Sequence, residues 1–168
     1  MKQLKTLAIA IVLFIGTQVS AQSKVAHIDV QALMTAMPEM KVAQDQMKKI
    51  QESYDKDYKN MVTEYQTKLQ KYEQESATAG DALNDTRSKE MQDMGNRIQQ
   101  FQQTAQKELG QKEMDLIKPI MEKAQKAIQK VAKAKGVNYV LDATTGSGVL
   151  FAEGGIDLLA DVKKELGF

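Results

Sequence analysis

The chain has 168 residues, with 23 basic and 22 acidic side chains, one histidine and no cysteine. This near balance of charge argues against nucleic acid as the main partner, and the lack of cysteine excludes disulfide bonds and thiol chemistry. A zinc site would have to rely on carboxylates, which is unusual, and no Ser-His-Asp or Cys-His set can be assembled. We therefore expect a protein that is not an enzyme and needs no cofactor.

The first 21 residues, MKQLKTLAIAIVLFIGTQVSA, predict a cleaved secretory signal peptide. Lys2 and Lys5 precede an apolar run at residues 7–15, and small residues end the segment at Ala21. A membrane span needs about 20 apolar residues, so a signal peptide is favoured over an anchor. Without these two lysines the mature chain has 21 basic and 22 acidic residues. We expect it to be exported, without stable insertion into a membrane.

Residues 25–30, VAHIDV, are rich in β-branched side chains and predict a short strand. Residues 39–77 contain no glycine or proline and consist largely of residues common in helices. Their apolar positions step by three or four residues in an eleven-residue repeat, which keeps a helical seam almost straight. The stripe consists of Met47, Ile50, Tyr54, Tyr58, Met61, Tyr65, Leu69 and Tyr72.

The stripe breaks at residues 76–85, SATAGDALND. Gly80 suits the position just past a helix end, and Asp81 can cap the helix that follows. A second helical stretch, with a sparser apolar stripe, then runs from about residue 82 to residue 135. These patterns predict an antiparallel helical hairpin over residues 38–135, with its tip near residues 76–85.

The two prolines predict a hinge in this arm. Pro38 lies 42 residues before Gly80 and Pro119 lies 39 residues after it, so an antiparallel hairpin places them at a similar height. A proline inside a helix removes a hydrogen bond and favours a kink. Two alternatives stay open: the matching heights are a coincidence, or Pro38 occupies the first helical turn, where it costs little.

The C-terminal part predicts strands at residues 138–141 and 149–152, followed by an amphipathic helix at residues 157–166. We interpret residues 144–148, TTGSG, as a hairpin connection between the two strands. A phosphate-binding loop is disfavoured, because the lysine of a Walker motif and the third glycine of a dinucleotide fingerprint are absent. Asp142 is expected to end the first of these strands.

A long hairpin brings its own ends together, so residues 22–37 and 136–168 should form one small body containing a sheet. So few residues cannot bury an independent core, and we expect the body to be stabilised by oligomerisation. The residues predicted to build this oligomerisation body are Val25, Ile28, Val30, Val137, Val140, Leu141, Val149, Leu150, Phe151, Leu159 and Val162.

The arm is the predicted binding surface for a partner. Nine methionines follow residue 21, and methionine is common on surfaces that accept many partners because it is flexible and polarisable. The candidate contact residues are Met61, Tyr65, Tyr72, Met91, Met94 and Phe101. The alternative, which we favour for the stripe residues, is that they fill the seam between the two helices.

The order of these segments resembles the Skp/OmpH-like family of periplasmic chaperones. The resemblance is carried by KVAHIDVQALM, the charged hairpin, IQKVAKAKGVNYVLDA, VLF and IDLLADVKKELG. It implies an α+β, mostly α fold and a homotrimer whose hairpins surround a cavity. It also implies an ATP-independent holdase, located in the periplasm, that binds unfolded outer-membrane proteins. The alternative is a structural or adaptor coiled-coil protein of the cell envelope.

Overall fold

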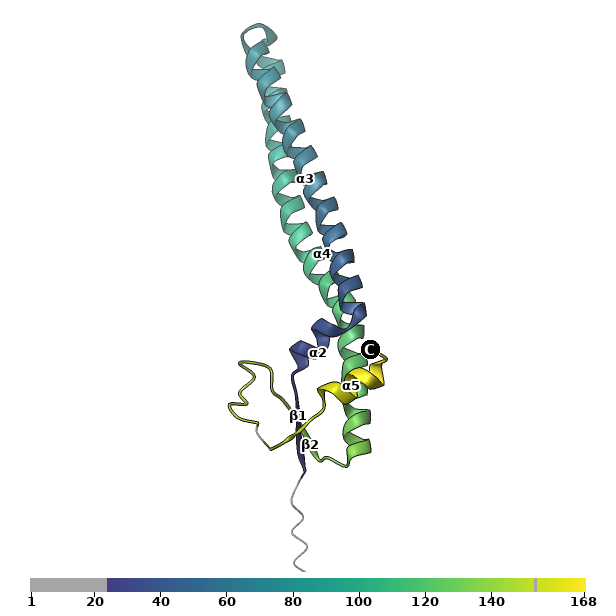
Figure 1. Cartoon of the computed structure of the whole chain (residues 1–168). Coiled ribbons are helices and arrows are strands. Elements are labelled where there is room, and N and C mark those ends of the chain that lie inside the picture. Colours follow the sequence, from purple (N-terminus) through teal and green to yellow (C-terminus); the bar gives the residue numbers. More distant parts are fainter. Residues whose placement is uncertain (1–23, 153) are drawn as a thin grey trace, which may run out of the picture.

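The structure is a computed structural model that describes residues 24–152 and 154–168; the predicted signal peptide, residues 1–21, lies outside the described residues. The elements are β1 (Val25–Ile28), α2 (Val30–Ala36), α3 (Pro38–Ala79), α4 (Asp81–Lys135), β2 (Tyr139–Asp142), β3 (Ile156–Asp157) and α5 (Leu159–Leu166). α3 and α4 form a long antiparallel arm, and the other elements form a small body at its base (Figure 1). The predicted α+β, mostly helical fold class is confirmed.

Pro38 lies at the start of the arm and does not kink it. Met37 has an extended backbone, with φ −68° and ψ 126°, because the residue before a proline avoids the helical region. Pro38 is therefore the first residue of α3, where its missing N–H costs no hydrogen bond. Pro119 does lie inside α4. An ion pair between Glu39 and Lys123 shows that the two prolines lie at a similar height on the arm.

Gly80 alone separates the two arm helices. Its φ of 76° lies in the region that favours glycine, so the chain reverses there without strain. Asp81 was expected to cap α4, but it is the first helical residue and its side chain caps nothing. The Asn84 side chain instead donates to the Ser76 carbonyl oxygen at 2.9 Å and ties the helices together across the tip.

The three strands form a parallel sheet in the order β2-β1-β3. This arrangement corrects the sequence prediction, because the third strand is β3 and residues 149–152 form no strand. Residues 144–148 are consequently not a hairpin connection. The first strand is also shorter than predicted: Asp29 accepts a hydrogen bond from the Ala32 N–H at 2.8 Å and caps α2, so Val30 is helical.

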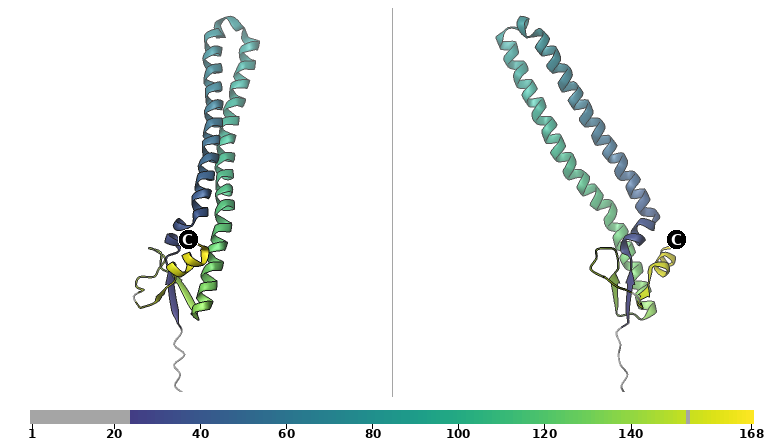
Figure 2. Two further views of the ribbon diagram at one scale, coloured as in Figure 1. Left: turned by 45° about the vertical axis from the view of Figure 1, so that its right-hand side comes forward. Right: turned by 60° about the vertical axis from the view of Figure 1, so that its left-hand side comes forward.

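The body shares one core with the base of the arm, beneath one face of the sheet. Ala26 and Ile28 of β1 are buried, while Val25 and His27 point to the opposite face, as strand alternation requires. The views in Figure 2 show α5 lying against the base of α4. The buried core residues that join these elements are Ala26, Ile28, Leu33, Met37, Ala43, Ile120, Ala124, Ala127, Val131, Leu158 and Val162.

Asp142 joins the end of β2 to the start of α2. Its carboxylate accepts hydrogen bonds from the Thr144 hydroxyl at 2.6 Å, the Thr144 N–H at 2.9 Å and the Val30 N–H at 3.4 Å. The Gln31 N–H donates to the Thr144 hydroxyl at 3.2 Å. Asp142, which ends β2, therefore serves as a structural link.

This link predicts a pH-dependent contribution to stability. The hydrogen bonds from Thr144 are the main cause that lowers the pKa of Asp142 below its ordinary value of 3.8. A carboxyl group whose pKa is lower in the folded state than in the unfolded state adds stability at pH values above the unfolded-state pKa. This stability is lost as the pH falls through the folded-state pKa. Asp142→Asn should therefore unfold at lower urea concentration than the wild type at pH 6, with the difference shrinking below pH 4. An equal difference at every pH would contradict this account.

Candidate interaction surfaces

The sheet face turned away from the helices is apolar and exposed. Val25, Tyr139 and Leu141 are exposed large side chains, and the register pairs Val25 with Tyr139 and His27 with Leu141. These four residues therefore form one patch, with the half-buried His27 within it. Tyr139 was not among the predicted body residues, although its alternation with Leu141 across Val140 was a signal for it. Gly155 lies against the His27 ring, while Val25, Tyr139 and Leu141 remain exposed.

The segment between β2 and β3 adds two more exposed apolar side chains. Leu150 is 99% exposed and Phe151 is 76% exposed. Large apolar side chains in such contact with water mark interaction sites. They fit the predicted role in oligomerisation, and Val25 and Leu141 of the sheet face fit it too.

Other predicted oligomerisation residues serve the chain's own core. Ile28 and Val162 are fully buried, and these side chains are not accessible to a partner. The residues that pack partly buried against this core are Val30, Val137, Val140 and Leu159. Val149 is half-buried. The structure thus divides the predicted set into a core group and an exposed group, which sequence alternation alone had not separated.

The predicted contact residues of the arm lie in or beside the seam. Met94 is buried between α3 and α4, so it is not available to a partner. The Tyr54 and Phe101 rings pack with their centroids 5.9 Å apart. The remaining candidates are half-buried: Met61, Tyr65, Tyr72, Met91 and Phe101. This burial agrees with the interpretation that the stripe mainly fills the seam.

Charged and hydroxyl groups hold the distal arm together. Glu90 accepts hydrogen bonds from Lys68 at 2.6 Å and from the Tyr72 hydroxyl at 2.7 Å. The contact with Lys68 is the main cause that lowers the pKa of Glu90. The Arg87 guanidinium lies 4.6 Å from the centroid of the Tyr72 ring and pairs with Glu75. Polar pairing thus replaces apolar packing near the tip.

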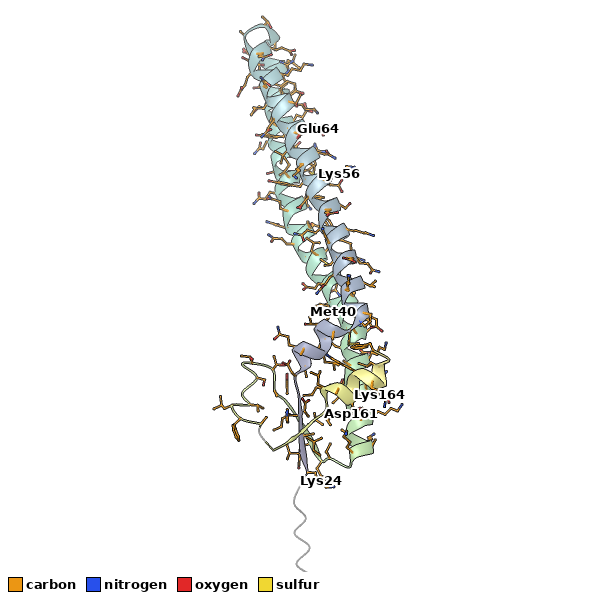
Figure 3. The ribbon with its side chains drawn as sticks, in the orientation of Figure 1. Lys24, Met40, Lys56, Glu64, Asp161 and Lys164 are labelled. Atoms are coloured by element: carbon orange, nitrogen blue, oxygen red, sulfur yellow. The ribbon has the colours of Figure 1, made fainter. Side chains whose placement is uncertain are left out.

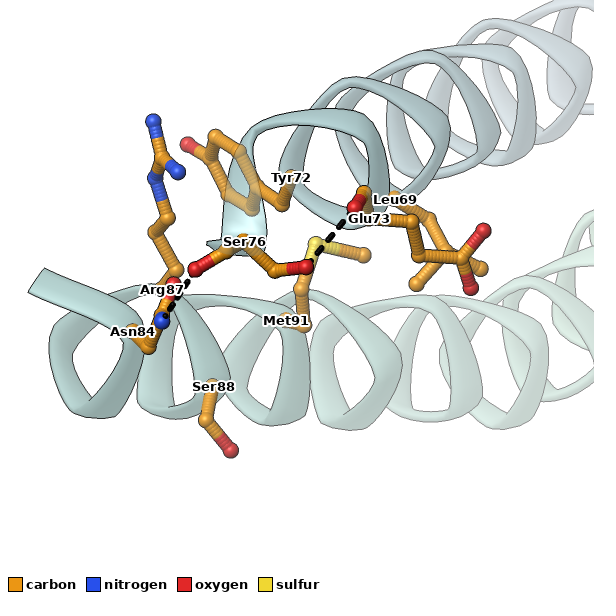
Figure 4. A pocket seen from close by; sticks show the side chains of 8 residues that line it. All are labelled: Leu69, Tyr72, Glu73, Ser76, Asn84, Arg87, Ser88 and Met91. Carbon is orange, nitrogen blue, oxygen red and sulfur yellow. Dashed lines mark hydrogen bonds between the residues drawn. The ribbon is translucent and has the colours of Figure 1, made fainter. Parts of the chain in front are cut away.

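An open groove of about 520 Å³ lies between the helices beside these pairs (Figure 4). Its walls combine apolar and polar side chains, and the Arg87 Nη1 atom is buried without a hydrogen-bond partner among the described residues. The lining residues are Leu69, Tyr72, Glu73, Ser76, Asn84, Arg87, Ser88 and Met91.

The described residues show neither a metal-binding cluster nor a membrane-spanning helix. Within residues 24–152 and 154–168, no three His, Asp or Glu side chains are grouped so that they could hold a metal ion. None of the helices in this part of the chain has the length and apolar character needed to span a membrane.

The fold and its exposed surfaces define a class of protein in which a helical hairpin arm projects from a small body that carries an uncovered apolar sheet face. A family model described as OmpH, outer membrane protein (OmpH-like), matches residues 24–166. The chain therefore belongs to the OmpH-like family, and the resemblance noted from its sequence is confirmed.

A solved structure supports the same fold. It is described as an outer membrane chaperone (OmpH-like) from Caulobacter crescentus, and it superposes with a TM-score of 0.76 over 90% of this chain and 88% of that chain. The two sequences are 18% identical, so the likeness concerns the fold. No curated protein sequence matched this chain.

Proposed function

We propose that this protein is an ATP-independent holdase of the periplasm, which binds unfolded outer-membrane proteins between its arms and prevents their aggregation. The observation that carries this proposal is a long arm rooted in a body whose exposed sheet face and Leu150–Phe151 pair are apolar and uncovered. Such a body is suited to joining copies of the chain, and joined bodies place several arms around one space. The family and the related fold support this function.

We further propose that the assembly is a homotrimer joined through the body. β2 and β3 are the two edges of the sheet, and an open edge offers N–H and C=O groups to a neighbouring chain. The exposed face and the Leu150–Phe151 pair supply apolar area beside these edges. Three arms around one unfolded client would raise the effective concentration of weak contacts, so no single contact has to be strong.

The proposed mechanism needs no nucleotide. Weak contacts along the arms keep the client's apolar segments apart while it remains unfolded. Insertion and folding of the client in the outer membrane then buries those segments and removes the client from the cavity. Since each arm contact is weak, its dissociation is fast, and release is driven by the client's own folding.

The test is suppression of aggregation without ATP. The protein lacking residues 1–21 is mixed with an outer-membrane barrel protein diluted from urea, and light scattering is followed. We expect scattering to be suppressed near one assembly per client, and the assembly mass in solution to be close to three times the chain mass. Undiminished scattering would contradict the holdase. Binding only to a folded envelope protein would favour the alternative, a structural or adaptor coiled coil.

A further inference from the structure

The part of the arm nearest the body carries an apolar row that the seam does not explain. Met114 and Met121 are 64% and 57% exposed, and their spacing of seven residues places them on the same side of α4. Ile117 lies between them and is half-buried. The residues of α4 that face the core lie on a neighbouring row, which includes Ile120 and Ala124.

A shallow cleft connects this row to the other arm helix. This mainly apolar cleft of about 70 Å³ lies between the two helices, and its edge includes two polar side chains. Its lining residues are Met40, Ala43, Gln44 and Met47 of α3 and Glu113, Leu116 and Ile117 of α4. Met40 lies where the arm leaves the body (Figure 3). Ile117 belongs to both the row and the cleft, so the row adjoins a cleft whose α3 wall carries two methionines. We call Met40, Met47, Met114, Ile117 and Met121 the methionine surface.

The side chains of this surface suit the binding of apolar segments that differ in sequence. Methionine side chains adjust their shape, and methionine is overused on surfaces that bind many sequences. The cleft is too small for a helix, and its volume of about 70 Å³ suits the end of a single side chain. An extended chain with apolar side chains is the partner that fits both features.

A second copy of this chain is a poorer occupant. A stable interface uses roughly 20–30 residues from each partner, whereas the methionine surface has five residues. It also lies on the arm, apart from the exposed sheet face and the Leu150–Phe151 pair in the body. Its size therefore fits a weak and transient contact.

We propose that the methionine surface is where each arm holds apolar segments of an unfolded client. This inference rests on the proposed holdase function and locates its contacts near the base of the arm, away from the candidates chosen from the sequence. Those candidates are half-buried or, for Met94, buried. In the methionine surface, Met114 and Met121 are exposed to solvent, and the other three residues are half-buried.

The test compares the double variant Met114→Gln/Met121→Gln with Val42→Gln. Val42 is 55% exposed and precedes Ala43 of the cleft, so it lies at the same height on the arm. Its neighbours one turn away, Asp45 and Gln46, are polar. The chain has no tryptophan, so tryptophan fluorescence of a urea-unfolded eight-stranded outer-membrane barrel protein reports binding directly. We expect about tenfold weaker affinity for the double variant and wild-type affinity for Val42→Gln.

Crosslinking gives a second readout on a folded protein. The chain has no cysteine, so Met114→Cys or Val42→Cys provides a single site for a benzophenone label. Illumination with the same client should give several-fold more crosslinked product from position 114 than from position 42. Circular dichroism and solution mass are measured for every variant, and both should match the wild type.

The outcomes separate the two proposals. If the wild type does not bind the client, the holdase function fails. If the wild type binds and the double variant binds equally well, the methionine surface is the wrong site although the holdase stands. Equal losses in Val42→Gln and the double variant, or equal crosslinking at both positions, would also overturn the inference. A changed assembly mass in the double variant would assign the surface to contacts between copies and overturn it too.

Discussion

Replacing Leu150 and Phe151 together by aspartate is expected to convert the assembly into single chains. Both side chains project into water and are 99% and 76% exposed, so the fold of one chain does not depend on them. In an interface, however, each carboxylate would be buried without a partner, at a cost of several kcal/mol. The solution mass should therefore fall to that of one chain while circular dichroism stays unchanged.

The loop around these residues offers a matched control. The Ser147 hydroxyl donates to the Asp142 carbonyl oxygen at 2.5 Å, and the side chain is exposed, so Ser147→Ala should cost about 1 kcal/mol or less. Its assembly and its protection of a client should match those of the wild type. If the double aspartate variant keeps the wild-type mass, the body interface proposed above is incorrect. If Ser147→Ala abolishes protection, our assignment of this loop to structure is incorrect.

Val140 must be kept separate from this test. The sequence placed Val140 and Leu150 together in the predicted oligomerisation body, so a charge at either position would be expected to dissociate the oligomer. In the structure Val140 packs against the core of its own chain, because it alternates with the exposed Tyr139 and Leu141 along β2. A charge at Val140 is therefore expected to unfold the body, and loss of assembly would then carry no information about the interface.

The second large effect is expected from Leu158→Ala. Leu158 is fully buried, and its N–H donates to the His27 carbonyl oxygen at 3.0 Å, so it joins α5 to β1. Truncating a fully buried leucine costs about 2–5 kcal/mol, which is a large part of the stability of so small a body. Hydrogen exchange of the β1 amides should become much faster, while exchange in the middle of the arm should change little.

The adjacent leucine provides the control. Leu159 is only partly buried, so Leu159→Ala should give a clearly smaller increase in exchange. Two ion pairs, Lys130–Glu165 at 2.5 Å and Lys135–Asp161 at 2.6 Å, also join α5 to α4. Such surface pairs contribute about 0–1 kcal/mol each, so they should not compensate for the loss of Leu158. Equal effects of the two leucine variants would show that burial does not hold α5 in place.

Most of the arm could be predicted from the sequence, because the signals that specify its helices are local. An eleven-residue repeat describes the stripe from Met47 to Tyr72, which is half-buried except at Leu69. Helix periodicity depends only on neighbouring residues. Gly80 marks the tip for an equally local reason, since glycine permits the backbone conformation of the turn. Local signals also located the amphipathic helix that closes the chain.

The body depended on contacts between residues far apart in the sequence. A two-residue strand such as β3 has no periodicity to detect, and its position next to β1 is decided by pairing across more than 120 residues. The apolar run at residues 149–152 has strong strand propensity, yet it finds no partner strand within one chain. Propensity for a strand measures fit to a neighbouring surface, so the sequence could not show that this surface was missing.

The tertiary structure also determined which apolar residues lie in the core and which lie on the surface. Hydrophobicity alone grouped Ile28, Val162, Leu150 and Phe151 together, but only the packing of α4 and α5 on one face of the sheet buries the first two. Met114 and Met121 are likewise exposed on the arm, which their apolar character alone does not show. Local sequence therefore determined the helices of the arm and α5. Contacts between distant elements determined the strands of the sheet and which side chains remain available for partners.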